Sequence, residues 1–509
     1  SAMGGTLADM QAKADKYMDG KEIPPFGTAP VTVPGTVDAW YALHEKFGSR
    51  PMLANLEPAI RYARDGAPIP EVISYYWSFG PKRFEPAHES GMLEEYDNAK
   101  KTYFSPTPHE GSIFTNPDLA DTLERIGQKG RDEFYKGETA RTMDTYFKRI
   151  GGPLRYEDFA KHTGEFVEPV CVTYRADYKV CELPPATQGI TALQMLKMLE
   201  KFDLKAMGYG SADALMAQIE AKRIAFADRA HYFADPKFSR IDASAFLKTD
   251  RLDRQAAAIK IDKAMDRVPN FAFGQVEPSI TSQEAAAADA KLKQGDTTYL
   301  TVTDKDGMMV SLIQSNYRGM GSGLVADGLG FMFQDRGQLF SLDPNHPNVF
   351  EPGKRPFHTI IPAFAFKKNM PSCQTRAMPI DQACPFEPWL SFGLMGGGMQ
   401  PQGHVQVILN LVDFGMGLQE AGDAARWEHV GGCEPTNGFS GDPCEADKGT
   451  VQLESGIPPA ARAELERRGQ TVKCCAANAG GYQAIMRDFE SGAWIAATEM
   501  RKDGVADGY

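Results

Sequence analysis

Hydrophobic positions recur with a helical period through the first half of the chain. In PGTVDAWYALHEKFG, residues 34–48, apolar residues return every three or four positions between a proline and a glycine. This spacing is typical of an amphipathic helix that carries its own start and stop signals. The same arrangement of an amphipathic run next to proline and glycine occurs in NLEPAIRYARDGAPIP and NPDLADTLERIGQKGRDEFYKG. The pattern predicts that residues 1–280 are mostly helical.

From residue 297 onward the pattern changes to short strands separated by turns rich in glycine and aspartate. Within this half, helices are expected at residues 403–413 and 457–469. The polar, alanine-rich run TSQEAAAADAKLKQ, residues 281–294, separates the two patterns and is typical of a linker. The sequence therefore predicts two parts, one ending in a linker at 281–296 and one beginning with a strand.

The stretch GDTTYLTVTDKDGMMVSLIQS, residues 295–315, predicts an antiparallel hairpin. If DKDG is its turn, strand pairing sets Thr297 opposite one of residues 314–316, so that the hydroxyls of Thr297 and Ser315 meet at one strand end. A threonine hydroxyl needs a base to become a nucleophile, and the simplest base is its own α-amine, freed by cleavage of the preceding peptide bond. That amine has an ordinary pKa of about 7.7–8.0, which suits proton transfer near neutral pH. Two threonines at a strand start also agree with β-propensity alone.

Composition excludes several kinds of partner. A chain of 509 residues with 42% hydrophobic content is long enough for two domains or one large layered domain. Its 55 basic and 67 acidic residues give a net charge of −12, which offers no reason to bind nucleic acid or an anionic membrane. No apolar run approaches the roughly 18–20 residues of a membrane helix. We therefore expect neither nucleic acid nor a membrane as partner.

The eight cysteines form no CxxC pair and no Cys/His cluster with zinc spacing, so no metal site is expected. Cys373 and Cys384 flank one loop rich in proline and polar residues, and Cys433 and Cys444 flank another. We expect disulfide bonds in these loops and, with them, an oxidising compartment, periplasmic or extracellular. Free thiols in a cytoplasmic protein are the alternative interpretation.

Four ordered motifs resemble the γ-glutamyltranspeptidase family of N-terminal nucleophile hydrolases. They are the hairpin GDTTYLTVTDKDGMMVSLIQS, the following GMGSGLV, EPGKRPFHTIIPAF and GLMGGG. VTVPGTVDAWYALHEKFG and ELPPATQGI extend the resemblance into the first half, although the family's usual first segment, with GGNAVDA, does not precede residue 6. The resemblance implies an α+β fold, the αββα sandwich of two stacked antiparallel sheets flanked by helices. It also implies a large subunit of residues 1–296 and a small subunit of residues 297–509.

The resemblance implies roles for individual residues. The chain is expected to cut itself between Asp296 and Thr297, after which Thr297 becomes the N-terminal nucleophile. Ser315 matches the hydroxyl that assists it. Gly396 and Gly397 match the glycines whose backbone N–H groups form an oxyanion hole, where glycine permits a close approach of the main chain. Without the family, GLMGGG would be interpreted as an ordinary tight loop. No cofactor is implied.

The substrate pocket departs from that of the γ-glutamyl enzymes. Their NNxMDDFS segment, whose second aspartate binds the α-ammonium group, is here FQDRGQLFS, with Leu339 in place of that aspartate and Arg336 in place of a polar amide or acid. A buried ammonium group without a carboxylate partner is strongly disfavoured, so glutathione is a doubtful substrate. Arg336 is expected to pair with a carboxylate on the acyl group instead.

Three further positions are expected to contact substrate. The serine pair of the family's KRPLSS is His358 and Thr359 here, and the asparagine after the assisting hydroxyl is Tyr317. These changes resemble the acylase and amidohydrolase branch of the family, which includes the glutaryl cephalosporin acylases and the oxamate amidohydrolases.

Each of these positions has a plainer interpretation. Arg336 could pair with Asp335 in a turn, and His358 could be a structural, hydrogen-bonded histidine. Tyr317 and Arg318 could shape the glycine turn that follows them. GMGSG lacks the strand, turn and helix of a phosphate loop, so no nucleotide is expected.

The sequence thus predicts an autoprocessing amidohydrolase or acylase that acts on a small-molecule amide through a Thr297 acyl-enzyme. Its two subunits come from one precursor and could pair into a dimer of heterodimers. Two alternatives stay open. One is a true γ-glutamyltransferase or glutathione hydrolase, and the other is an unprocessed, non-catalytic homologue that acts by binding.

Overall fold

The computed structural model describes residues 4–239, 242–271, 273, 295–369, 384–433, 446–475 and 479–508. The chain divides into two compact units. Unit 1 comprises Ser1–Phe166, Ser315–Pro344 and Val349–Pro356, and unit 2 comprises Val167–Gln314, Asn345–Asn348 and Phe357–Tyr509. These units differ from the expected subunits, because the chain passes from unit 2 to unit 1 after Gln314. The boundary at 296/297 concerns cleavage and stays a prediction, and the expected linker at 281–294 lies outside the described residues.

Unit 1 is largely helical, as the pattern of its sequence predicts. The amphipathic stretch at 34–48 forms α2, Thr36–Phe47, which ends at Gly48. The helices bury a core rich in aromatic side chains, among them Phe84, Tyr146 and Phe147, which supply large apolar surfaces. The other elements are α1 (Leu7–Tyr17), α3 (Met52–Asp65), α4 (Glu71–Trp77), α5 (Phe79–Glu89), α6 (Asp97–Tyr103), α7 (Pro117–Lys129), α8 (Arg131–Tyr135), α9 (Glu138–Arg149), α10 (Tyr156–Ala160), η3 (Arg336–Leu339) and the paired strands β1 (Ala67–Pro68) and β2 (Ile113–Phe114).

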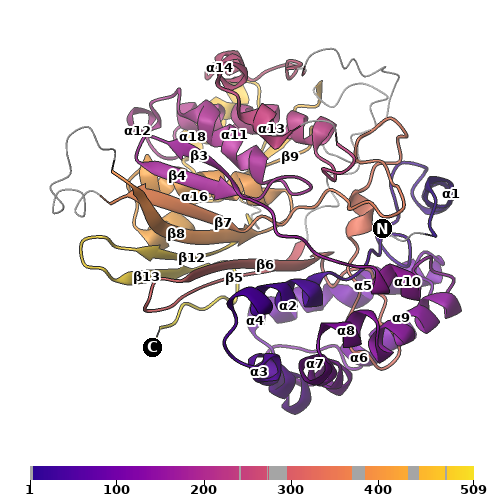
Figure 1. Cartoon of the computed structure of the whole chain (residues 1–509). Helices are drawn as coiled ribbons and strands as arrows, with labels where there is room; N and C mark the ends of the chain where they lie inside the picture. Colours follow the sequence, from indigo (N-terminus) through magenta and orange to yellow (C-terminus); the bar gives the residue numbers. More distant parts are fainter. Residues whose placement is uncertain are drawn as a thin grey trace. The chain divides into compact units, whose positions relative to one another are not determined.

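Unit 2 contains a six-stranded antiparallel sheet with the strand order β13-β12-β8-β7-β4-β3. Figure 1 shows helices gathered over one face of this sheet, with α16 packed directly on β8, and β5 lying along the other face. The strands are β3 (Val170–Tyr174), β4 (Tyr178–Glu182), β7 (Ala363–Lys368), β8 (Phe386–Met395), β12 (Gly481–Arg487) and β13 (Trp494–Thr498). The α+β class is therefore confirmed.

The helices of unit 2 include two that are buried on nearly every side. α11, Gly189–Leu199, and α13, Ala212–Tyr232, have few exposed residues, which is typical of helices enclosed within a layered domain. The remaining helices are α12 (Leu204–Met207), η1 (Ala243–Leu247), α14 (Thr249–Ala258), α16 (Met399–Val412), α17 (Leu418–Asp423) and α18 (Pro459–Arg467). α16 and α18 confirm the two helices predicted in the second half. A small sheet of β9 (Trp427–Val430), β10 (Thr450–Leu453) and β11 (Val472–Cys474) completes the unit.

The predicted hairpin is formed by β5, Gly295–Thr303, and β6, Met309–Arg318, which pair as a two-stranded sheet. Its turn falls at DKDG, where the Asp304 N–H donates to the Met308 carbonyl (3.0 Å). Across the strands, the Tyr299 and Ser311 hydroxyls are hydrogen bonded at 2.7 Å. The turn lies where the sequence predicts it, and the expected alignment of Thr297 with residues 314–316 stays a prediction.

Disulfide bonds occur at positions that the sequence did not single out. Cys171 and Cys181 are directly opposite each other on β3 and β4 and are bonded across the strands. Cys474 and Cys475 form a bond between neighbours in the chain. Cys384 and Cys433 each take part in a disulfide bond as well. The partners expected for them, Cys373 and Cys444, lie outside the described residues, so those two pairings stay predictions.

In the parts of the chain that the structure describes, no helix combines the length and the apolar character needed to cross a membrane. Over the same residues, no group of three or more His, Cys, Asp or Glu side chains is arranged to hold a metal ion.

Candidate active site

Thr297 lies on the buried face of β5. Side chains alternate along this strand, and Thr297 is 9% exposed. On the same face, Thr301 Oγ1 donates to Ser391 Oγ of β8 at 2.6 Å, and the Tyr299 ring fills the space that a side chain at Gly393 would need. Thr301 thus lies against Ser391, and Tyr299 lies against Gly393. Residues two apart on a strand share a face, so two further residues along each strand place Thr297 beside Met395, the last residue of β8.

The glycine loop, Gly396–Gly398, follows β8 and leads into α16. Gly396 and Gly397 have φ of 131° and 61°, in the left-handed region that favours glycine. A Cβ on Gly396 would lie 3.2 Å from Gly480 Cα, whereas a Cβ on Gly397 would have nothing within 4 Å. Gly396 therefore needs glycine for packing as well as conformation, and Gly397 faces open space.

The backbone of the loop is oriented by the first turn of α16. The Gly396 carbonyl accepts from the Met399 N–H (3.1 Å), and the Gly397 carbonyl accepts from the Gln400 N–H (3.2 Å). These bonds pair the first two N–H groups of α16 with the loop, and the N-terminus of this 14-residue helix carries the positive end of its dipole. Such an arrangement can stabilise an anion or an oxygen that develops negative charge.

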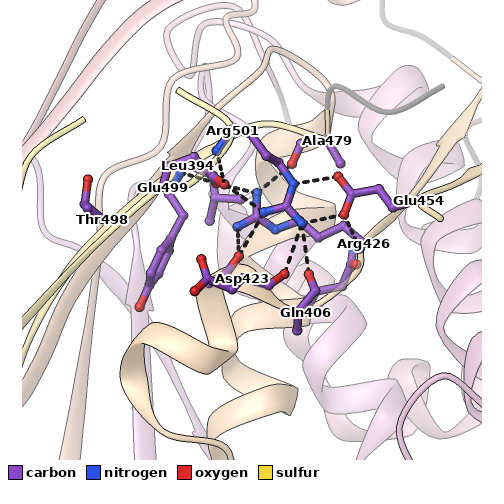
Figure 2. Close-up of polar contacts among 12 residues, drawn as sticks. Leu394, Gln406, Asp423, Arg426, Glu454, Ala479, Thr498, Glu499 and Arg501 are labelled. Atoms are coloured by element: carbon purple, nitrogen blue, oxygen red, sulfur yellow. Dashed lines mark hydrogen bonds and ion pairs between the residues drawn. The ribbon is translucent and has the colours of Figure 1, made fainter. Parts of the chain in front are cut away.

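A buried ion-pair network supports the far side of the loop (Figure 2). Arg426 donates to the Ala479 carbonyl and to Glu499, both at 2.8 Å, which fixes the backbone just before Gly480. Arg501 pairs with Glu499 and with Glu454 in the same cluster. Burial lowers the pKa of Arg426, while Glu499 opposes that change. The guanidiniums outweigh the burial of Glu499 and hold its pKa below the ordinary value.

Thr359 and Gly397 are brought together by a residue that the sequence analysis did not single out. The side-chain amide of Gln188 donates to the carbonyls of Thr359 (2.7 Å) and Gly397 (2.8 Å). The neighbouring His358 N–H donates to the Ala186 carbonyl at 2.9 Å. Gln188 belongs to the motif ELPPATQGI, and membership of that motif was the only feature of the sequence that could have drawn attention to this residue.

Within unit 1, Ser315, Tyr317 and Arg336 lie close together. Tyr317 has φ of 77°, a strained conformation for a bulky side chain that points to a functional constraint. Its N–H donates to Ser315 Oγ at 2.8 Å. The guanidiniums of Arg318 and Arg336 lie 5.7 and 5.4 Å from the centre of its ring, within the range of cation–π attraction.

Asp335 is fully buried beside these two arginines and accepts from the Arg318 N–H at 3.1 Å. Burial raises the pKa of Asp335 to about 7, against the opposing effect of Arg318 and Arg336. Burial also lowers the pKa of Arg336 to about 10, so its guanidinium stays charged at neutral pH. Asp335 interacts electrostatically with Arg336, which agrees with the plainer interpretation that the two residues pair in a turn. Two guanidiniums beside a carboxyl that is partly protonated near neutral pH are a chemical arrangement that suits an anionic group.

The segment FQDRGQLFS is anchored by backbone contacts within unit 1. The Gly337 N–H donates to the Pro30 carbonyl (2.7 Å), and Gln334 Nε2 donates to the Thr32 carbonyl (3.0 Å). Leu339 is buried at the end of η3. An apolar side chain therefore occupies the position that resembles the ammonium-binding aspartate.

The predicted site residues fall into two sets, each described within its own unit. Thr297, His358, Thr359, Gly396 and Gly397 belong to unit 2, and Ser315, Tyr317 and Arg336 belong to unit 1. Asp296 is part of β5, but its side chain lies outside the described residues. Their roles in catalysis and binding stay predictions.

The layered sheets and flanking helices define an N-terminal nucleophile hydrolase fold. The sequence profile described as gamma-glutamyltranspeptidase matches residues 5–509, and the chain belongs to this family. It is 32% identical over 414 residues to the glutathione hydrolase-like YwrD proenzyme of Bacillus subtilis strain 168, which covers 81% of this chain and 70% of that protein. It is 30% identical over 517 residues to the oxamate amidohydrolase proenzyme of Klebsiella pneumoniae, which covers 100% of this chain and 86% of that protein.

Among solved structures, that of a cephalosporin acylase from Bacillus halodurans superposes with a TM-score of 0.79 at 34% identity. The match covers 100% of this chain and 84% of the acylase. Sequence and structure therefore agree on an enzyme family that contains acylases, amidohydrolases and glutathione hydrolases.

Proposed function

We propose that this protein is an autoprocessing amide hydrolase whose nucleophile is Thr297. The observation that carries the proposal is the position of Thr297 on β5, in line with the end of β8 that leads into Gly396 and Gly397. A hydroxyl in that place would lie beside the glycine loop, whose Gly396 and Gly397 N–H groups are assigned to the oxyanion, so one arrangement would supply both a nucleophile and an oxyanion site. Several relatives are named as proenzymes, which supports self-cleavage.

Self-cleavage would begin with attack of Thr297 Oγ1 on the carbonyl carbon of Asp296. The C–N bond breaks, the acyl group moves to oxygen, and the Thr297 nitrogen takes up the proton. Water then hydrolyses the ester, which leaves a carboxylate on Asp296 and a free α-amine on Thr297. Turnover repeats this chemistry on substrate: the amine accepts the hydroxyl proton and returns it to the leaving amine, and water releases the acyl group.

The proposed substrate is an amide whose acyl group carries a carboxylate. Leu339 offers no partner to an ammonium group, and unit 1 holds two guanidiniums around one partly protonated carboxyl. Relatives named as an oxamate amidohydrolase and a cephalosporin acylase support a substrate other than glutathione. Ser315 is assigned to assist the nucleophile, and Tyr317, His358 and Thr359 are assigned to the substrate.

Intact mass under denaturing, reducing conditions, with N-terminal sequencing of the smaller fragment, tests the nucleophile. We expect two fragments, the second comprising residues 297–509 and beginning Thr-Thr-Tyr-Leu-Thr. A chain that stays whole after prolonged incubation and turns over no amide would overturn the proposal and favour a non-catalytic homologue.

Turnover of glutaryl-p-nitroanilide against γ-glutamyl-p-nitroanilide tests the substrate class. The two compounds differ by the α-amino group, so their ratio of kcat/KM isolates the contribution of an ammonium contact. We expect the glutaryl compound to be preferred. Preference for the γ-glutamyl compound would instead identify a γ-glutamyltransferase or glutathione hydrolase.

We also propose that the protein matures in an oxidising compartment. The bonded cysteines Cys171, Cys181, Cys384 and Cys433 support this, because structural disulfides persist where thiols are not kept reduced. Thiol titration of the denatured chain without reductant should find no reactive thiol, and a substantial thiol content would contradict the assignment.

A further inference from the structure

Gln188 lies in the connection between β4 and α11, in the motif ELPPATQGI to which the proposed chemistry assigns no role. It is the residue immediately before α11, and its side chain is fully buried. Its amide nitrogen donates to the carbonyls of Thr359 and Gly397, and its amide oxygen accepts from Arg229 Nη1 at 2.6 Å. Both amide protons and the amide oxygen are therefore engaged.

The chemistry of the partners fixes the orientation of this amide. Carbonyl oxygens only accept and a guanidinium only donates, so the nitrogen of Gln188 must face Thr359 and Gly397, and its oxygen must face Arg229. One side chain thus joins α13, the segment before β7 and the glycine loop. Loss of these hydrogen bonds would leave buried polar groups of Gln188 and its partners unpaired, which is energetically costly. This cost favours the one orientation of the amide that satisfies all of them.

The glycine loop depends on such contacts because it has no side chains of its own. The carbonyl and the following N–H of one peptide unit point in opposite directions, so a bond to the Gly397 carbonyl also orients the Gly398 N–H. Two further hydrogen bonds hold the Thr359 segment in place. The His358 N–H donates to the Ala186 carbonyl, and the Ile361 N–H donates to Gln400 Oε1 (3.1 Å). Gln188 sets the spacing between these two segments.

Arg229 holds Gln188 from the opposite side. Its guanidinium is fully buried and lies 3.7 Å from the centre of the Phe226 ring and 5.5 Å from that of Phe357. A Cβ on Gly398 would lie 4.0 Å from Arg229 Nη1. The guanidinium therefore adds positive charge close to the start of α16, where it reinforces the helix dipole.

We propose that Gln188, held by Arg229, is a positioning residue that keeps the glycine loop and the Thr359 segment in register for catalysis. This inference rests on the proposed function of Thr297. It predicts that Gln188 controls both self-cleavage and turnover, because the same loop stabilises the oxyanion in each reaction. It also predicts an effect on kcat with little effect on KM, since the loop acts on the transition state.

The test compares Gln188→Met with Gln406→Met. Gln406 is a matched control, because it is buried in the same unit, its amide nitrogen donates to the Gln402 and Trp427 carbonyls, and its oxygen accepts from the Trp427 N–H. Both variants should lose a similar amount of thermal stability. Gln188→Met should also lower kcat by about 100-fold with KM within about threefold, and slow self-cleavage to a similar degree, since misplaced oxyanion donors cost roughly that factor.

Gln188→Glu is the second variant, in case the methionine variant does not fold. It keeps the shape and the contact with Arg229 but cannot donate from an ionised carboxylate to either carbonyl, so it should show the same loss, with Gln406→Glu as its control. If the Gln188 and Gln406 variants lower Tm alike and leave kcat and self-cleavage alike, the positioning role is refuted while the proposed function stands. If the wild-type chain neither cleaves itself nor hydrolyses an amide, the proposed function fails and the positioning role fails with it.

Discussion

Gly396 packs closely against the main chain of Gly480, and Gly480 in turn packs against the Met395 carbonyl. A Cβ on Gly396 would lie 3.2 Å from Gly480 Cα, and a Cβ on Gly480 would lie 2.7 Å from the Met395 carbonyl oxygen. Both contacts are with backbone atoms, which cannot rotate away. The close packing of two main chains is thus part of what holds the glycine loop after β8.

Gly397→Ala should reduce activity more than it reduces stability. Alanine at a left-handed position costs about 1–2 kcal/mol, and displacement of the loop should lower kcat by about 10²–10³-fold. Gly415→Ala is the matched control, because Gly415 has φ of 68° and open space around its Cβ position, like Gly397. Steady-state kinetics and thermal unfolding of both variants provide the check. Equal kcat in the two variants would argue against a special role for the loop.

Thr297→Ala should abolish self-cleavage, whereas Thr297→Ser should retain it at a reduced rate. The alanine variant has no nucleophile, while serine keeps the hydroxyl and loses only the methyl group. Intact mass over a time course distinguishes a single chain from two fragments. Neighbouring Thr298→Ala is the control, since its side chain lies on the exposed face of β5. Cleavage of Thr297→Ala at the usual bond would exclude Thr297 as the nucleophile.

Glu499→Gln should destabilise the protein by about 3–5 kcal/mol, because it leaves two arginines of a buried network without a shared carboxylate. Arg426 and Glu499 are both almost completely buried at a separation of 2.8 Å. The exposed pair of Arg254 and Asp250 provides the contrast, and Asp250→Asn should leave the free energy of unfolding nearly unchanged. Chemical denaturation measures both values. Similar costs at the two sites would mean that the network in Figure 2 contributes little.

Asp335 should make stability depend on pH. Its pKa is raised to about 7 in the folded chain, so folding favours the protonated carboxyl. The stabilisation is complete below the unfolded pKa of about 4 and is lost as the pH rises through about 7. Asp335→Asn stays neutral, and at pH 8 it should be more stable than the wild type by roughly 2–4 kcal/mol, with no such gain at pH 4.

The same titration should affect an anionic substrate. Above about pH 7 the Asp335 carboxyl is ionised beside Arg318 and Arg336 and competes for their positive charge, so the KM of a carboxylate-bearing amide should rise as the pH increases through about 7. Asp335→Asn should remove this change in KM. A wild-type KM that does not vary between pH 6 and 8 would contradict a role for this cluster in substrate binding.

Much of the fold could be predicted because its signals are local. The helix at Thr36–Phe47 follows from apolar residues three and four apart and from Gly48 after it, and the hairpin follows from alternation on either side of DKDG. α16 begins at Met399, before the predicted residue 403, because the glycine loop leads directly into the helix. The motifs around Thr297 and Gly396 also identified the family, since their order along the chain is a property of the sequence.

What only the tertiary structure decided are contacts between residues far apart in the chain. Gln188 and Gly397 are 209 positions apart, and Arg426 and Glu499 are 73 apart. Neither pair leaves a periodic pattern, because a side-chain amide or a guanidinium finds its partners only after the sheet and helices have packed. The sequence by itself determined the elements and the chemical groups available to the site. Packing decided which buried polar groups hold the glycine loop in place, since each must find a partner once water is excluded.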